Sequence, residues 1–248
     1  MVNIRKLALQ AIERIIYKGG YANIVINEYL NKYELDDNDR RLFTRLVLGT
    51  VERRITLAYY LEPFLRKKQK PLINCLLLMS VYQLVYLNIP EHVVVNESVK
   101  LANSTDRMIG SFINAVLRNF LRNELRTFDN LDEIQKLSVE YSYPTWLVAY
   151  LLKDYDQETV SKILSFNDEV KNDAVRINTL KANYDEVIDQ LNKEKIEYRK
   201  IRFLDIIAIS DDSGNAIAIA RQKSSFAVFH ILLRNFAEIK GGDDIFDW

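Results

Sequence analysis

One nearly uncharged apolar segment constrains the fold of this chain more than any other feature. It runs from Leu72 to Pro90 and contains no Asp, Glu, Lys or Arg. Three amide side chains interrupt it, so it lacks the run of about 18 apolar residues that a membrane span requires. Pro71 is suited to the first turn of a helix. The segment therefore predicts a helix over Leu72–Leu87 at the centre of a helical bundle.

The residues on both sides of this segment show the period of amphipathic helices. Apolar residues from Ile4 to Ile15 recur at intervals of three and four, and Gly19-Gly20 is placed to end that helix. The Asp36–Asp39 cluster provides an N-cap for the next long helix. Another helix is expected through Val51 and Ile55. About seven helices with short connections predict an all-α bundle over residues 1–128. The last of these helices carries Met108, Phe112, Ile113, Val116 and Phe120 on its apolar face.

The pattern changes in the second half. Three short helices are expected between residues 130 and 166, with Trp146 and Leu147 facing inward. Alternation from Val175 to Leu180 then predicts a strand. A helix from Asn183 and further strands at 196–203, 206–209 and 216–220 follow, and Ser224-Ser225 can cap a helix through Phe226 and Phe236. We therefore expect a helical linker over 129–170 and a small α+β unit over 171–248.

Net charge separates the same two halves. The whole chain has 34 basic and 34 acidic residues, yet residues 1–128 hold 19 Lys/Arg against 12 Asp/Glu. The first half therefore carries a charge of +7 and the second half −7. A basic half favours a phosphate-rich partner, although many proteins with this charge bind none. A single cysteine excludes a disulfide framework, and with no signal peptide we expect a cytoplasmic protein that binds no membrane.

The residues that carry chemistry are few. His92 and His230 lie far apart in the sequence, and neither has the neighbours that a metal site needs. His92 is expected at the start of a helix. Cys75 stands among apolar residues, where a thiol is usually inert core. No glycine-rich phosphate loop or hydrolase motif occurs. We therefore expect no metal and no catalytic residue in this chain.

Basic residues in the first half are the candidate binding groups. Arg5 and Lys6 open the first helix, and Arg118 and Arg122 lie one turn apart on the last. Arginine binds phosphate oxygens with two N–H groups and stacks on unpaired bases. The alternative is a solvated charged surface, in which Arg118, for example, pairs with Glu97. Further clusters are Arg40, Arg41 and Arg45, then Arg53 and Arg54, and the loop residues Arg66, Lys67, Lys68 and Lys70.

Several segments resemble a known family. The sequences Val93–Ala102 and Ser111–Asn119 are similar to the signature helices of NusB-like RNA-binding domains, as are Leu78–Leu87 and Leu46–Val51. Tyr141–Leu147 (YSYPTWL), Arg176–Lys181 (RINTLK) and Ser224-Ser225 follow in the order typical of bacterial 16S ribosomal RNA cytosine-C5 methyltransferases of the RsmB (Sun) family. The resemblance is strong to residue 181 and weak after about residue 200.

The resemblance implies a NusB-like domain, a helical linker, a ferredoxin- or RRM-like unit and a domain that binds S-adenosylmethionine. In the family, the cofactor loop and both catalytic cysteines follow a strand that begins like Gly242–Asp247, and this sequence ends at Trp248. We therefore expect a truncated, RNA-binding N-terminal portion that holds no cofactor, with 16S ribosomal RNA as partner. Two alternatives stay open, a free-standing NusB-like antitermination factor and a bundle that binds other proteins.

Overall fold

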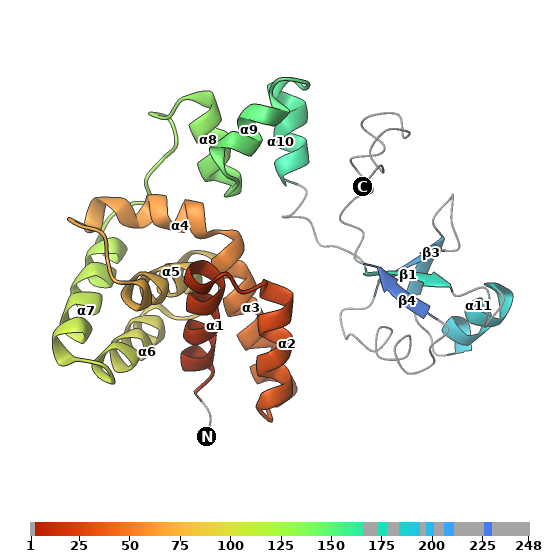
Figure 1. Cartoon of the computed structure of the whole chain (residues 1–248), viewed down its shortest axis with the longest axis horizontal. Helices are drawn as coiled ribbons and strands as arrows, with labels where there is room; N and C mark the ends of the chain where they lie inside the picture. Colours follow the sequence, from red (N-terminus) through yellow and green to blue (C-terminus); the bar gives the residue numbers. More distant parts are fainter. Residues whose placement is uncertain are drawn as a thin grey trace. The chain divides into compact units, whose positions relative to one another are not determined.

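The computed structural model describes residues 3–165 and then 173–177, 184–193, 197–200, 206–210 and 226–229 (Figure 1). The chain divides into two compact units, Met1–Leu164 and Ser165–Trp248. Among the described residues, the first unit contains only helices, whereas the second contains an antiparallel sheet and one helix. The helical first half and the change to strands agree with the sequence pattern.

Polar side chains cap the first and third helices at their starts. The Asn3 side chain accepts a hydrogen bond from Lys6 N and begins α1 (Ile4–Lys18), which ends at Gly19 in the left-handed conformation (φ 70°). After α2 (Ala22–Lys32), Asp36 accepts from Asp39 N and begins α3 (Asp37–Glu52). The caps confirm the expected ends of α1 and α3.

The next helix differs from the prediction at its start. The predicted helix through Val51 and Ile55 is interrupted, because Arg53 leaves the helical conformation (φ −92°, ψ 12°) between α3 and α4 (Arg54–Leu61). A short 3₁₀ turn, η1 (Glu62–Phe64), follows. The remaining helices of the bundle are α5 (Pro71–Tyr86), α6 (Glu91–Asn103) and α7 (Arg107–Arg122).

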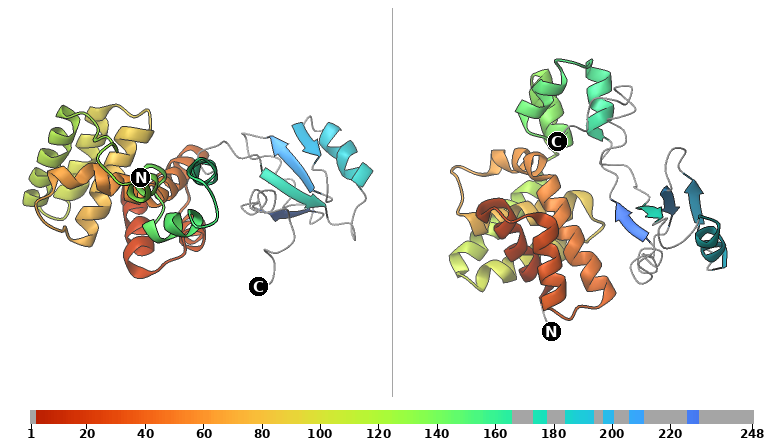
Figure 2. Two further views of the ribbon diagram at one scale, coloured as in Figure 1. Left: turned by 90° about the horizontal axis from the view of Figure 1, so that it is seen from above. Right: turned by 45° about the vertical axis from the view of Figure 1, so that its right-hand side comes forward.

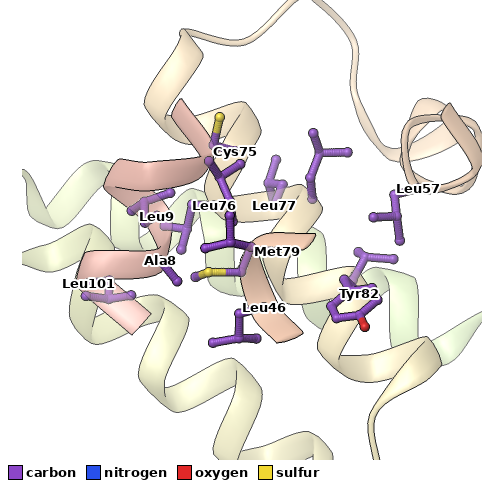
Figure 3. Packing of buried hydrophobic residues seen from close by; sticks show 14 of the residues in the cluster. Ala8, Leu9, Leu46, Leu57, Cys75, Leu76, Leu77, Met79, Tyr82 and Leu101 are labelled. Carbon is purple, nitrogen blue, oxygen red and sulfur yellow. The ribbon is translucent and has the colours of Figure 1, made fainter. Parts of the chain in front are cut away.

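Helix α5 forms the centre of the bundle, as its apolar sequence predicts. It contacts α1, α3, α4, α6 and α7, and an unbroken stretch from Cys75 to Gln83 is buried. Figure 3 shows side chains of α1, α3, α4 and α6 around those of α5. Gly49 of α3 allows a close approach to α5, since a Cβ atom there would lie 2.0 Å from the Tyr82 ring.

Three short helices, α8 (Glu133–Tyr141), α9 (Thr145–Leu151) and α10 (Gln157–Ser165), complete the first unit. Figures 1 and 2 show them in green beside α4, in orange. Two hydrogen bonds make this α4–α8 corner: Ile55 N donates to Ser142 Oγ (3.0 Å), and Thr56 Oγ1 donates to the carbonyl oxygen of Val139. The prediction that Trp146 faces inward is wrong, because it is 69% exposed and Val148 and Leu151 form the buried face of α9.

The second unit contains a four-stranded antiparallel sheet with the order β2-β3-β1-β4. Its elements are β1 (Asp173–Ile177), α11 (Tyr184–Lys193), β2 (Glu197–Lys200), β3 (Ile206–Ser210) and β4 (Phe226–Phe229). The first four confirm expected elements. The predicted helix at Phe226 is wrong at its start, because Phe226–Phe229 pairs with β1 as a strand, a conformation that Phe and Val favour. The strand expected at 216–220 lies outside the described residues.

No helix in the described part of the chain has the length and apolar character needed to cross a membrane. The central helix α5 has 16 residues, and its polar Ser80 and Gln83 are buried inside the bundle. Their side chains bond to the carbonyl oxygens of Leu76 and Met79, respectively. The apolar segment is therefore a core helix of the bundle.

Candidate RNA-binding surface

A groove lies on the bundle between the η1–α5 connection and α7. It has a volume of about 640 Å³. Two cations from the predicted basic loop, Arg66 and Lys67, line it together with the amides Gln69 and Asn119. Its remaining lining is apolar and consists of Phe64, Ile73, Met108, Ile109, Phe112, Ala115 and Val116.

A second, smaller groove of about 120 Å³ adjoins the first. Ile73 and Ile109 line both of them, so the two grooves are neighbours. The second groove adds Lys6 from α1 and the hydroxyl residues Ser104 and Thr105 between α6 and α7. Among the described residues, the lining of both grooves includes three cations and no Asp or Glu. We call this pair of neighbouring grooves the basic groove.

The basic groove differs from a hollow of similar size between α1 and α2. There, Glu13 and Glu28 stand among the cations. Arg14 pairs with Glu28, and Lys18 Nζ lies 3.4 Å from Glu13 Oε2. Glu28 also raises the pKa of Arg14 through a side-chain hydrogen bond and its charge. Two of the three cations on that hollow are therefore paired with carboxylates, whereas no carboxylate lines the described part of the basic groove.

The structure gives Arg5 and Lys6 different surroundings. Arg5 is partly buried, and its Nε donates to Oε1 of Gln83 at 2.9 Å. Gln83 is fully buried and donates its own amide to the Met79 carbonyl. Arg5 therefore holds an internal polar group of the bundle. Lys6 is exposed and lies at the basic groove.

Arg118 and Arg122 are exposed on the C-terminal half of α7. Arg118 Nε donates to Asn114 Oδ1 at 3.0 Å. The alternative pairing of Arg118 with Glu97 is wrong, since Glu97 bonds to Lys100 Nζ at 2.7 Å. Arg118 directly precedes Asn119, which lines the basic groove, but Arg118 itself does not line it. Of the four predicted residues, Lys6 is the one that lines the basic groove.

Sequence reasoning missed the exposure of Met108. Its place in the apolar period of α7 predicts a core residue, yet 79% of it is exposed. It is the second residue of α7, so it lies in the first turn of that helix. The basic loop was visible in the sequence, but the groove that Arg66 and Lys67 share with α7 depends on tertiary packing.

The described residues offer no nucleophile or metal centre. Cys75 is buried, and desolvation raises the pKa of its thiol to about 12, with a smaller contribution from the charge of Glu13. The prediction that Cys75 packs in the core is confirmed. His92 is exposed in the first turn of α6, as expected. In the part of the chain that the structure describes, no three His, Cys, Asp or Glu side chains gather as metal ligands would.

Two family models match the chain. The NusB family matches residues 2–122, which cover the whole α1–α7 bundle. Residues 2–122 form a NusB-family domain. The ferredoxin-like domain of the RsmF/B-like methyltransferases matches residues 143–210, from the start of α9 to the end of β3. The two domains occur in the order expected from the resemblance.

Curated relatives match this chain over part of their length. Over 203 residues the chain is 35% identical to the probable ribosomal RNA small subunit methyltransferase B of Bacillus subtilis, covering 80% of this chain and 45% of that protein. The probable enzyme of the same name from Synechocystis is 32% identical, over 77% of this chain and 44% of its own length. The chain is thus related to the N-terminal part of these methyltransferases, and it spans about half their length.

A solved structure supports the fold. The crystal structure of PH0851 aligns with 92% of this chain and 53% of its own, with a TM-score of 0.66 and 16% sequence identity. At this identity the match concerns the fold alone. It extends beyond the NusB-family bundle, which covers residues 2–122.

Proposed function

We propose that this chain is the RNA-binding N-terminal portion of a ribosomal RNA cytosine-C5 methyltransferase, with 16S ribosomal RNA as its partner. The basic groove is the observation that carries the proposal, since three cations line it with no acidic residue among the described lining. The relatives' names supply the choice of RNA, because they act on the small ribosomal subunit's RNA. The protein then works in the cytoplasm.

Phosphate binding follows from the chemistry of the groove. Lysine and arginine release counterions from RNA when they contact its phosphates, so affinity depends on salt. Arg66 adds the planar guanidinium that binds two phosphate oxygens together. Lys6, Arg118 and Arg122 extend the contact along α1 and α7, and Arg5 contributes the guanidinium N–H groups other than Nε.

The second unit has a supporting role in this proposal. Its antiparallel sheet with α11 is the ferredoxin- or RRM-like unit that the match over residues 143–210 favours. The family resemblance places methyl transfer and S-adenosylmethionine in a part of the longer chain that these residues do not include, and the chain spans 45% of the Bacillus subtilis relative. We therefore assign RNA binding, and no methyl-transfer step, to the residues of this chain.

The experiment measures RNA affinity against salt concentration. A 16S ribosomal RNA transcript is titrated with the wild type, with the Lys6→Ala/Lys67→Ala variant and with Lys100→Ala, whose ammonium already bonds to Glu97. Two lost phosphate contacts should lower the slope of log affinity against log salt by about 1.4 on single-stranded segments. The Lys100→Ala control should keep the wild-type slope.

Each outcome has a clear meaning. Equal slopes for the wild type and the double variant would show that neither Lys6 nor Lys67 contacts phosphate, and the groove would lose two of its three proposed phosphate contacts. Arg118→Ala/Arg122→Ala is the matched variant at the other end of α7, and a lower slope there would extend the surface along the helix. If the wild type binds no RNA even at low salt, the bundle is better explained as a protein-binding module.

A further inference from the structure

The floor of the basic groove is apolar, which phosphate contacts alone do not explain. Met108 is 79% exposed there, and Ile109 and Phe112 line the groove beside it. The amide N–H of Met108 donates to Oδ1 of the Asp106 cap at 2.7 Å, so the cap fixes the backbone of this residue at the groove. Among the described residues of this lining, Met108 is the one large apolar side chain that is exposed, whereas Ile109 and Phe112 are partly buried against the core. An apolar face of a ligand would cover Met108 and the exposed edges of its two neighbours.

The groups around this floor specify the rest of the ligand. Arg66 and Lys67 stand beside it as cations, and Gln69 and Asn119 provide amides. Among the described residues, no carboxylate lines the groove that would repel an anion. An unpaired nucleotide has the same three features, namely the apolar face of a base, a polar base edge and an anionic phosphate.

We infer that this groove binds an unpaired nucleotide of single-stranded RNA, with its base against Met108 and Phe112 and its phosphate toward Arg66 and Lys67. The inference rests on the proposed function and adds selectivity to it. In a duplex, both faces of each base are covered by stacking, so a duplex offers the groove no base face. The methionine thioether makes favourable contacts with aromatic rings and adapts its shape to different bases. The groove thus selects single strands with little preference for sequence.

The test compares three probes with the full chain: an oligouridylate, an RNA duplex of equal length, and a single-stranded oligomer of the same length with abasic positions. Met108→Asn removes the apolar contact without changing charge. It should weaken oligouridylate binding about three- to tenfold and leave the other two probes unaffected. Lys67→Ala should weaken all three, because all carry phosphate. Leu125→Asn is the control, since Leu125 is also exposed (47%) but does not line the groove.

A gain-of-signal variant provides an independent measurement. Met108→Trp places an indole on the floor, and stacking of a base should quench its fluorescence with oligouridylate but not with duplex or abasic RNA. The wild type, with its own two tryptophans, provides the background signal. Absence of quenching at saturating oligouridylate would overturn the inference.

Other outcomes are equally decisive. If Met108→Asn weakens the abasic and oligouridylate probes equally, the floor does not contact bases and the inference fails. It also fails if the variant keeps its affinity for oligouridylate and instead loses binding to an acidic amphipathic peptide, which would assign the groove to a protein partner. In both cases, an RNA affinity that still falls with salt as in the wild type would continue to support the proposed function. That function fails separately if the wild type binds none of the three RNAs.

Discussion

At the residue scale, the neighbours Arg5 and Lys6 should contribute differently to the stability of the protein. Arg5→Ala leaves Oε1 of buried Gln83 without its 2.9 Å hydrogen bond, so the free energy of unfolding should fall by about 1–2 kcal/mol. Lys6→Ala removes an exposed side chain and should change stability little. Urea unfolding of the two variants measures the difference. Equal stabilities would show that the Arg5–Gln83 bond contributes nothing.

The buried thiol of Cys75 should make the folded protein less stable at alkaline pH. Burial raises its pKa from 9.0 to about 12 in the folded protein, whereas the unfolded thiol ionises near its ordinary value. The unfolded chain therefore releases the proton first, and the stabilisation, complete below pH 9, is lost progressively between about pH 9 and 12. The stability of the wild type relative to Cys75→Ala should decrease over this range. A constant difference in unfolding free energy from pH 7 to 10.5 would contradict the prediction.

Sequence reasoning worked for residues whose surroundings are set by their own helix. Cys75 is buried because both its neighbours and its helix are apolar, and His92 is exposed because it begins a helix. It failed for Met108 and Trp146, which have an apolar character but lie where no other described element covers them. Apolar periodicity predicts which side chains can be buried, but the packing of other elements decides which of them are.

At the element scale, two threonines on adjacent helices give a matched pair of predictions. Thr56 Oγ1 of α4 bonds to the carbonyl oxygen of Val139, at the α4–α8 corner. Thr50 Oγ1 of α3 is buried and has no hydrogen-bond partner among the described residues. Valine has nearly the same shape as threonine. Thr56→Val should therefore destabilise the protein by about 1–2 kcal/mol, and Thr50→Val should stabilise it by about 1 kcal/mol.

Chemical denaturation of both variants provides the check. The opposite signs matter more than the magnitudes, since both substitutions make the same chemical change in a buried position. If Thr50→Val is as destabilising as Thr56→Val, loss of a hydroxyl in this core is unfavourable regardless of its partner. In that case the stability of the α4–α8 corner would not depend on the hydrogen bond of Thr56.

Helices were predicted well where polar caps or proline mark their ends. Asn3, Asp36 and Asp106 each accept a backbone hydrogen bond at the start of a helix, and Pro71 begins α5. The break at Arg53 carries no such signal in the sequence. In the fold, the Arg53 guanidinium lies over the Tyr86 ring (5.5 Å), and these two residues are distant in the sequence. Strand β4 was missed for a similar reason, since it is defined by pairing with β1. Capping residues and prolines therefore predict where a helix begins or ends, whereas a break or a strand that accompanies tertiary contacts is not visible in the local sequence.

At the scale of the whole molecule, the charge asymmetry predicted two parts with a boundary near residue 128, whereas the structure divides the chain into two compact units after Leu164. The resemblance in the sequence named the families that match these parts, NusB and the RsmF/B-like ferredoxin-like domain. The candidate site was predicted less fully, because Lys6 was named for RNA binding while the groove beside it joins side chains from α1, α5, α6 and α7. Sequence alone identifies basic residues, but it does not show which of them share a hollow with an apolar floor.

The composition of the first unit leads to a prediction about fragments. Residues 1–128 contain the complete bundle and should fold alone as an all-α domain. Residues 1–164 also keep the α4–α8 corner, in which Ser142 and Val139 bond to α4, so this fragment should unfold at a higher urea concentration. Both fragments contain every residue that lines the basic groove. Circular dichroism with urea, followed by RNA titration, tests the two properties separately. Both fragments should bind oligouridylate with the salt dependence of the full chain, and a lower slope in either would mean that phosphate contacts lie outside the bundle.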